Sequence, residues 1–247
     1  MKRLIDVSSD CFLPVDKLNK SWSTYFTELA DQSTIPLLKE FYAAGAISDQ
    51  TPLSKVPFVA MDFETTGLDA NNDDIVSIGM VPFSLKRIYC RRSKHWIVKP
   101  RRELAENSVV IHGIKHSDIL EAPDINTLFE ELLSLMAGKV MVVHYQHIER
   151  NFLAHAFKSR LGEGIIFPLI DTMLLEKNIR LQQRSLCDRL LQRPLPSIRL
   201  GDCRRRYHLP HYQSHHALSD SLASAELFQA QVSYHFDADL PISALWC

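Results

Sequence analysis

The pattern of apolar and polar residues changes near residue 56. Before it, the chain is largely polar and lacks strand alternation, but segments 20–32 and 34–47 have apolar residues at helical spacing. Two prolines and several turn-forming residues in "SDQTPLSKVP" then indicate a linker. We therefore expect residues 1–55 to form an N-terminal helical extension and linker, and residues 56–247 to form a separate domain.

After residue 56 the pattern is typical of strands first, and then of helices alternating with strands. Apolar or alternating runs predict strands at residues 57–64, 74–82, 88–98 and 139–144, and a short strand or extended run at residues 165–171. Apolar residues at helical spacing predict helices at residues 124–137, 147–160, 171–178, 183–192 and 216–235. Because three strands precede the alternating elements, we expect an α/β domain with a mixed sheet.

Composition narrows the class of protein without identifying a function. With 247 residues, of which 46% are hydrophobic and 23% charged, the chain is expected to be globular. A net charge of −1 shows no overall attraction for nucleic acid, so any such binding must use local patches. The five cysteines contain no CxxC pair, which argues against a zinc or disulfide framework. No apolar run is long enough for a signal peptide or a membrane span, so we expect a soluble, cytoplasmic protein with no membrane partner.

Two carboxylates interrupt the first strand, in "FVAMDFETTGLD". Asp62 and Glu64 share one strand face and lie about 6–7 Å apart along the chain. Two ionised acids at that distance repel each other unless a cation lies between them, so the pattern indicates a metal site. The alternative is a strand that frays at Asp62 and continues as a polar loop.

Two more acids lie where they could join this pair. Glu149 lies on the apolar stripe of helix 147–160, and Asp220 lies on that of helix 216–235. His215 precedes Asp220 by five residues and could flank a shared site. Both acids also lie in a first helical turn, where a carboxylate commonly serves the helix dipole instead. A lone histidine is more commonly a surface residue or a satisfied core residue.

Three motifs resemble those of the DEDDh, or DnaQ-like, family of 3′–5′ exonucleases, which includes the proofreading epsilon subunit of bacterial DNA polymerase III. They are "DFETTGL", "VVHYQHIERNFLAHAF" and "HHALSDSLASAELF", in the family's order, and "VIHGIKHSDI" and "PLIDTMLLEK" match weaker segments. The similarity covers residue 57 to about residue 235. It implies a ribonuclease-H-like core, in which a mixed five-stranded sheet is flanked by helices.

The resemblance also implies a mechanism. Asp62, Glu64, Glu149 and Asp220 would hold two Mg²⁺ or Mn²⁺ ions, and His215 would be the general base. Asp62 would bridge the two ions. The reaction would remove nucleoside 5′-monophosphates from the 3′ end of single-stranded nucleic acid. DNA is the favoured substrate, and trimming of RNA or oligoribonucleotides is the alternative.

The second motif departs from the family pattern at two positions. Tyr145 stands where the family usually has Asn, and Glu149 stands where it has Asp. A longer carboxylate is tolerated if it reaches its metal through water, so we expect an active variant. A catalytically weak nucleic-acid-binding module is the alternative, and Asp171 is a second acid with which the motif could align.

The resemblance places substrate contacts beside the first motif. The turn formed by Thr65, Thr66, Gly67 and Leu68 would contact the terminal nucleotide, with Leu68 against its base. His112 and Ile114 would line the same pocket, although "HGI" could equally be a buried loop anchor.

The basic clusters and the N-terminal extension could contact substrate or partners away from the acidic residues. The clusters at 91–94, 99–102 and 204–206 are solvated surface or, for 204–206, a region that steers phosphates. Residues 1–55 could cap the sheet, mediate dimerisation or recruit a protein partner.

Overall fold

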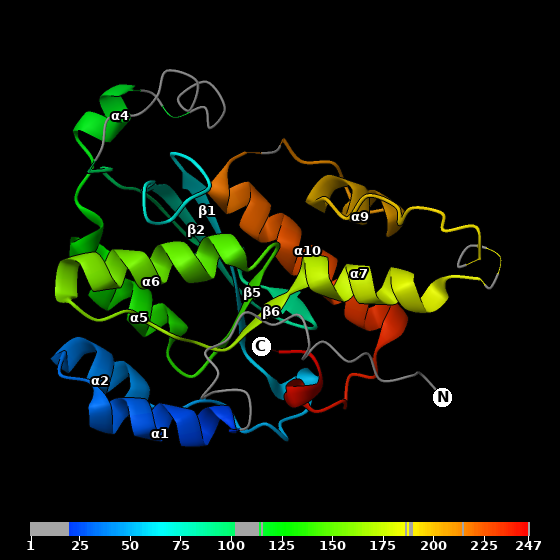
Figure 1. Ribbon diagram of the computed structural model, residues 1–247, viewed down its shortest axis with the longest axis horizontal. Helices are drawn as coiled ribbons and strands as arrows, with labels where there is room; N and C mark the ends of the chain where they lie inside the picture. The colour runs from blue at the N-terminus through cyan, green and yellow to red at the C-terminus, as the bar shows by residue number, and fades with distance from the viewer. Residues whose placement is uncertain are drawn as a thin grey trace.

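The protein is a mixed six-stranded sheet with helices on both faces (Figure 1). The computed structural model describes residues 20–101, 114, 116–185, 187, 190–213 and 215–246. The strands are β1 (Phe58–Thr65), β2 (Ile75–Ser84), β3 (Arg87–Ile88), β4 (Lys94–Ile97), β5 (Val140–Val143) and β6 (Leu169–Asp171). Their order is β3-β2-β1-β5-β6, and β4 also pairs with β2. The predicted α/β class with a mixed sheet is confirmed.

The sheet is antiparallel on one side of β1 and parallel on the other. β1 pairs with β2 in antiparallel orientation, whereas β1 with β5 and β5 with β6 pair in parallel. Every residue of β5 is buried, as expected for a short apolar strand covered on both faces. The parallel strands therefore end at the same edge of the sheet, where the first two sequence motifs meet.

The sheet has six strands instead of the predicted five because the run at 88–98 forms two strands. Both β3 and β4 pair with β2, separated by the short 3-10 helix Cys90–Arg92. Between their two pairing regions lies Pro82 of β2, whose carbonyl accepts from the backbone N–H of Tyr89. A proline has no N–H to donate to the ladder, so continuous pairing along this edge is interrupted there.

The α-helices largely follow the predicted periodicity. They include α1 (Trp22–Gln32), α2 (Pro36–Ala43), α4 (His116–Leu120), α5 (Phe129–Met136), α6 (His147–Leu161), α7 (Thr172–Gln183), α9 (Leu200–Arg206) and α10 (Ala217–His235). The helix predicted at 124–137 begins as a 3-10 turn, Ile125–Leu128, before α5. α7 continues beyond its predicted end at residue 178. The helix predicted at 183–192 lies partly outside the described residues.

Helix α10 packs across β1 and β2, and a glycine determines how closely it approaches. A Cβ at Gly79 of β2 would overlap the carbonyl group of Ala217, the first residue of α10. The buried hydroxyl of Ser221 lies 2.9 Å from the Gly79 carbonyl oxygen and holds the same contact. The first turn of α10 therefore packs directly against β2, the strand next to β1.

The N-terminal extension contains two helices, as predicted, and they pack against the rest of the molecule. The ring centroids of Trp22 and Trp246 lie 6.3 Å apart, and the hydroxyl of Tyr42 accepts from the backbone N–H of Ile166. In Figure 1 the helices α1 and α2 lie at the opposite end of the molecule from the start of α10. The domain boundary near residue 56 stays a prediction. Among the described residues, no helix combines the length and apolar character needed to cross a membrane.

Candidate active site

Three carboxylates converge at the end of β1. One oxygen from each of Asp62, Glu64 and Asp220 lies within 4.8 Å of the others. The strand does not fray at Asp62, because Asp62 pairs with Gly79 and Glu64 pairs with Ser77 in the β1–β2 ladder. Alternation along β1 directs both acids to one face, and the first turn of α10 brings Asp220 to it.

The turn before α10 connects the proposed base to this cluster. The backbone N–H of His215 donates to the carboxylate of Asp220 over 2.9 Å, and His215 itself has a φ of 68°. A non-glycine residue in this region is uncommon and needs support from its surroundings. The Asp220 carboxylate supplies that support. Both side chains line a cavity of about 570 Å³ that adjoins α9 and α10.

Glu149 lies in the first turn of α6 and is 2% exposed. Its atom Oε2 is buried and has no hydrogen-bond partner among the described residues. Its carboxyl group accepts a hydrogen bond from the backbone of Phe63, and its charge acts on Asp62. Glu149 is thus not a surface carboxylate serving only the helix dipole, because it faces the acids of β1.

Asp171, the other acid with which the second motif could align, has a structural position. Its Oδ1 accepts from the backbone N–H groups of Tyr145 and Met173, and its Oδ2 accepts from that of Gln146. It therefore caps α7 and anchors the turn that follows β5. Because these backbone groups already engage both oxygens, Asp171 is a weaker candidate for a metal ligand than Glu149.

The pKa values of the closely spaced acids Asp62, Glu149 and Asp220 are raised. Burial raises the pKa of Asp62 well above its usual value, and the charges of Glu149, Asp220 and Glu64 raise it further. Burial likewise raises the pKa of Glu149 well above its usual value. The pKa of Asp220 is raised by burial, against the opposing effect of the hydrogen bond from His215. Such a cluster favours either protonation or a bound cation.

The donor set fits a divalent cation. Carboxylate oxygens are the ligands that Mg²⁺ and Mn²⁺ prefer, and three of them lie within reach of one another. Oε2 of buried Glu149, which has no hydrogen-bond partner among the described residues, adds an oxygen from a fourth acid. The pattern of residue types along the sequence had indicated the same four acids.

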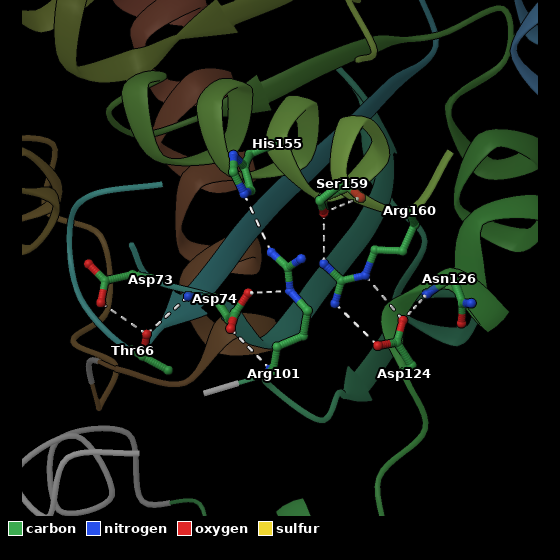
Figure 2. A network of polar contacts seen from close by, with 10 residues as sticks. Thr66, Asp73, Asp74, Arg101, Asp124, Asn126, His155, Ser159 and Arg160 are labelled. Carbon is green, nitrogen blue, oxygen red and sulfur yellow. Dashed lines mark hydrogen bonds and ion pairs between the residues drawn. The ribbon is translucent and has the colours of Figure 1, made fainter. Parts of the chain in front are cut away.

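The turn after β1 is held tightly, and its tip is exposed. The Thr65 hydroxyl donates to the Gly67 carbonyl over 2.6 Å, and the Thr66 hydroxyl lies 3.1 Å from Oδ1 of Asp73 (Figure 2). A Cβ at Gly67 would overlap the Asp73 carboxylate, so a larger residue there would require the Asp73 side chain to move. Leu68 is 84% exposed. The turn therefore presents one apolar side chain to the solvent.

The second part of the expected terminal-nucleotide pocket is only partly described. His112 lies outside the described residues, and Ile114 is half-buried. Both stay predictions.

Figure 2 shows a polar network that the sequence did not indicate. Arg101 donates through its backbone N–H to Oδ2 of Asp74 over 3.0 Å, and its guanidinium lies 3.5 Å from Oδ1. The same guanidinium lies 3.4 Å from Nε2 of His155 on α6. Arg160 of α6 pairs with Asp124. Arg101, from the basic cluster at 99–102, thus connects the start of β2 to α6.

The arginine cluster at 204–206 is also largely structural. Arg204 is buried and donates to the carbonyl of Ala223 and the carboxylate of Glu226, both on α10. Arg206 pairs with the buried Glu176 of α7 over 3.0 Å. Arg205 is exposed and pairs with Asp202. Two of the three arginines therefore join α9 to its neighbours, and a role of this cluster in steering phosphates stays a prediction.

A histidine pair beside Glu64 was missed by sequence reasoning. His216 caps α10, and its ring centroid lies 4.7 Å from that of His95 on β4. His95 also lies 2.8 Å from the hydroxyl of Ser77, the residue paired with Glu64. Burial and the neighbouring His216 lower the pKa of His95. Strand β4 places His95 beside His216, and no local sequence pattern indicates that these two histidines meet.

Comparison with known proteins agrees with this geometry. The model of the exonuclease family RNase_T matches residues 59–228. The chain therefore belongs to this exonuclease family, and the resemblance drawn from the motifs is confirmed.

Individual relatives define the resemblance further. The PolC-type DNA polymerase III of Thermotoga maritima is 30% identical over 182 residues, which are 74% of this chain and 12% of the relative. The DNA polymerase III subunit epsilon of Treponema pallidum is 24% identical over 185 residues, 73% of this chain and 78% of that protein. The chain thus spans a small part of the PolC-type relative and most of the epsilon subunit.

A solved structure shows the same fold. The nuclease domain of 3′hExo, a DEDDh family member bound to rAMP, superposes with a TM-score of 0.56 at 16% identity. The match covers 72% of this chain and 92% of that domain. The ribonuclease-H-like exonuclease fold expected from the motifs is confirmed.

Proposed function

We propose that this chain is a metal-dependent 3′–5′ exonuclease that releases nucleoside 5′-monophosphates from single-stranded nucleic acid. The observation that carries the proposal is the convergence of Asp62, Glu64 and Asp220 within 4.8 Å, in a chain of an exonuclease family. Buried Glu149 and exposed His215 complete the set of residues. DNA is the favoured substrate, because the relatives are DNA polymerase III proteins.

Four carboxylates would hold the metal. Asp62, Glu64 and Asp220 offer oxygens close enough to share an ion, and Glu149 contributes a buried charge beside Asp62. We expect two Mg²⁺ or Mn²⁺ ions, with Glu149 acting through water because its side chain is longer than the usual Asp. When bound, the ions supply an activated water and stabilise the charge that develops on the leaving oxygen.

Residues of the protein would accept the proton and position the substrate. The imidazole of His215 accepts the proton of the attacking water, as a general base beside the acids. The bond from the His215 backbone N–H to Asp220 keeps that imidazole at the mouth of the site. The turn from Thr65 to Leu68 contacts the 3′-terminal nucleotide, and exposed Leu68 packs against its base. His112 and Ile114 would close the same pocket.

RNA is the alternative substrate. The observation that favours it is the rAMP bound to the DEDDh relative 3′hExo, since a ribonucleoside monophosphate fits that site. Discrimination between the two nucleic acids depends on contacts to the 2′-hydroxyl.

A turnover assay tests the proposal. Single-stranded DNA and RNA carrying a 5′ label are incubated with Mg²⁺ or Mn²⁺, and the products are resolved by length. We expect a ladder that shortens from the 3′ end, with mononucleotides as the second product. Asp62→Asn is the matched inactive control. If the wild-type protein leaves every oligonucleotide intact with either cation, the proposal is wrong.

A further inference from the structure

Tyr145 has a strained backbone and an exposed ring. It lies two residues after Val143, the last residue of β5, has a φ of 89°, and is 45% exposed. A positive φ is unusual for a bulky residue and persists only where the surroundings hold it. Here the backbone N–H groups of Tyr145 and Gln146 both donate to the Asp171 carboxylate over 3.0 Å. The fold thus holds an aromatic ring at the surface at an energetic cost.

The ring lies beside the proposed catalytic residues. A cavity of about 290 Å³ is lined by Tyr145, His147 and Met173. The cavity of about 570 Å³ that contains His215 and Asp220 is also lined by Met173. The two cavities are therefore neighbours along one surface, which leads from the acids past Met173 to the Tyr145 ring.

The charges along this surface suit a phosphodiester backbone. Arg199 lines the larger cavity, and Lys177 lines the smaller one. Asp202 in the larger cavity pairs with Arg205 over 3.1 Å, and the oxygens of Asp171 in the smaller one bind backbone N–H groups. Positive side chains beside an exposed aromatic ring are the combination with which proteins bind single-stranded nucleic acid.

The path of the nucleic-acid strand across the site follows from the positions of the Thr65–Leu68 turn and of α9. The residues that line the larger cavity include none from the Thr65–Leu68 turn, where the 3′-terminal nucleotide is expected. In Figure 1 the loop after β1 and helix α9 lie on opposite sides of the start of α10. The terminal nucleotide would thus lie on the side of the acids that carries the loop after β1. The upstream part of the nucleic acid would lie on the side of α9.

The geometry points to Tyr145 as a stacking platform for an unpaired base upstream of the scissile phosphate. This inference rests on the proposed exonuclease function and adds a specificity-determining residue to it. The ring of His147, with its centroid 5.1 Å away, supports the Tyr145 ring from the side. A base inside a duplex has both faces covered by its neighbours, so the ring favours single strands. DNA and RNA bases share the stacking chemistry.

Two substrates separate this role from catalysis. A short oligothymidylate engages the upstream surface. The p-nitrophenyl ester of thymidine 5′-monophosphate carries a p-nitrophenyl group in place of the upstream nucleoside, so it uses only the terminal-nucleotide side. Tyr145→Asn removes the ring while keeping a residue that tolerates positive φ, and Tyr145→Phe keeps the ring. Tyr234→Asn, at an exposed tyrosine of α10, is the matched control.

We expect Tyr145→Asn to raise KM for the oligonucleotide about tenfold more than KM for the ester, as loss of one stacked base predicts. Tyr145→Phe and Tyr234→Asn should behave like wild type on both substrates. Fluorescence anisotropy with a labelled oligonucleotide in EDTA measures binding without turnover, and Tyr145→Asn should weaken it by a similar factor.

Equal losses on the ester and the oligonucleotide would overturn the inference, because Tyr145 would then only shape the catalytic site. Unchanged oligonucleotide binding by Tyr145→Asn would overturn it as well. If wild type cleaves neither substrate, the exonuclease proposal fails, and the anisotropy comparison alone decides whether Tyr145 binds single strands.

Discussion

Asp62 and Gly79 lie directly opposite each other on neighbouring antiparallel strands, and α10 begins against that glycine. The contact between Gly79 and Ala217 therefore determines where Asp220, three residues into α10, meets the acids of β1. A residue without a side chain thus controls the geometry of a proposed metal site.

Replacing Gly79 with alanine tests this dependence. The new Cβ would overlap the backbone of Ala217, so α10 must shift. We expect Gly79→Ala to lower the free energy of unfolding by about 1–3 kcal/mol and to weaken metal binding. Gly201→Ala in α9 is the control, because a Cβ there would meet no atom within 4 Å. Urea unfolding of the two variants measures the difference, and equal stability of Gly79→Ala and wild type would contradict it.

Magnesium should stabilise the folded protein. Ions that bind the acid cluster bind the folded state alone, which adds about 2.7 kcal/mol at a concentration of 100 times Kd. We expect Tm to rise with Mg²⁺ or Mn²⁺ in a thermal denaturation series. Asp62→Asn should raise the metal-free Tm, because it relieves repulsion, and should lose most of the metal-dependent rise. A wild-type Tm that neither cation changes would count against the site.

Without metal, the stability should depend on pH through the acid cluster. The folded-state pKa values of Asp62 and Glu149 are raised above their ordinary values of 3.8 and 4.5. Their protonated forms therefore favour the folded state, and this contribution is lost as the pH rises through the folded-state pKa values. In EDTA, we expect wild type to lose more stability than Glu149→Gln as the pH rises above the ordinary pKa values of these groups. Parallel Tm profiles for the two proteins would contradict the expectation.

His215 should be needed for turnover and not for metal binding. His215→Asn preserves a residue that tolerates the φ of 68°, while it removes the imidazole. We expect kcat to fall by about 10²–10⁴ because general-base catalysis is lost, while the magnesium-dependent rise in Tm is retained. His208→Asn, at another exposed histidine with positive φ, is the matched control and should retain full activity. Undiminished turnover by His215→Asn would remove the residue from its role.

Local periodicity was sufficient for much of the fold. The apolar runs located β1, β2 and β5, and helical spacing located α6 and α10, since strands and helices bury side chains at fixed intervals. The same spacing indicated which acids face inward. Glu149 was singled out because it lies on an apolar stripe, and it is 2% exposed in the fold.

The division of the third predicted strand could not be read from spacing alone. Pro82 interrupts the edge of β2, but its effect depends on which strand pairs there and from which side. The basic clusters illustrate the same difficulty. Arg101, Arg204 and Arg206 were expected at the surface or on phosphates, and each has an acidic partner from a distant segment.

The sequence by itself determined the family, the sheet class and the order of the acidic residues, because these follow from motifs and from periodicity within single elements. The tertiary structure decided that the Asp62, Glu64 and Asp220 oxygens approach within 4.8 Å, that Asp171 binds backbone N–H groups, and that the Tyr145 ring remains exposed. Each of these depends on a contact between residues remote in the chain, and the strength of such contacts depends on distances that only packing establishes.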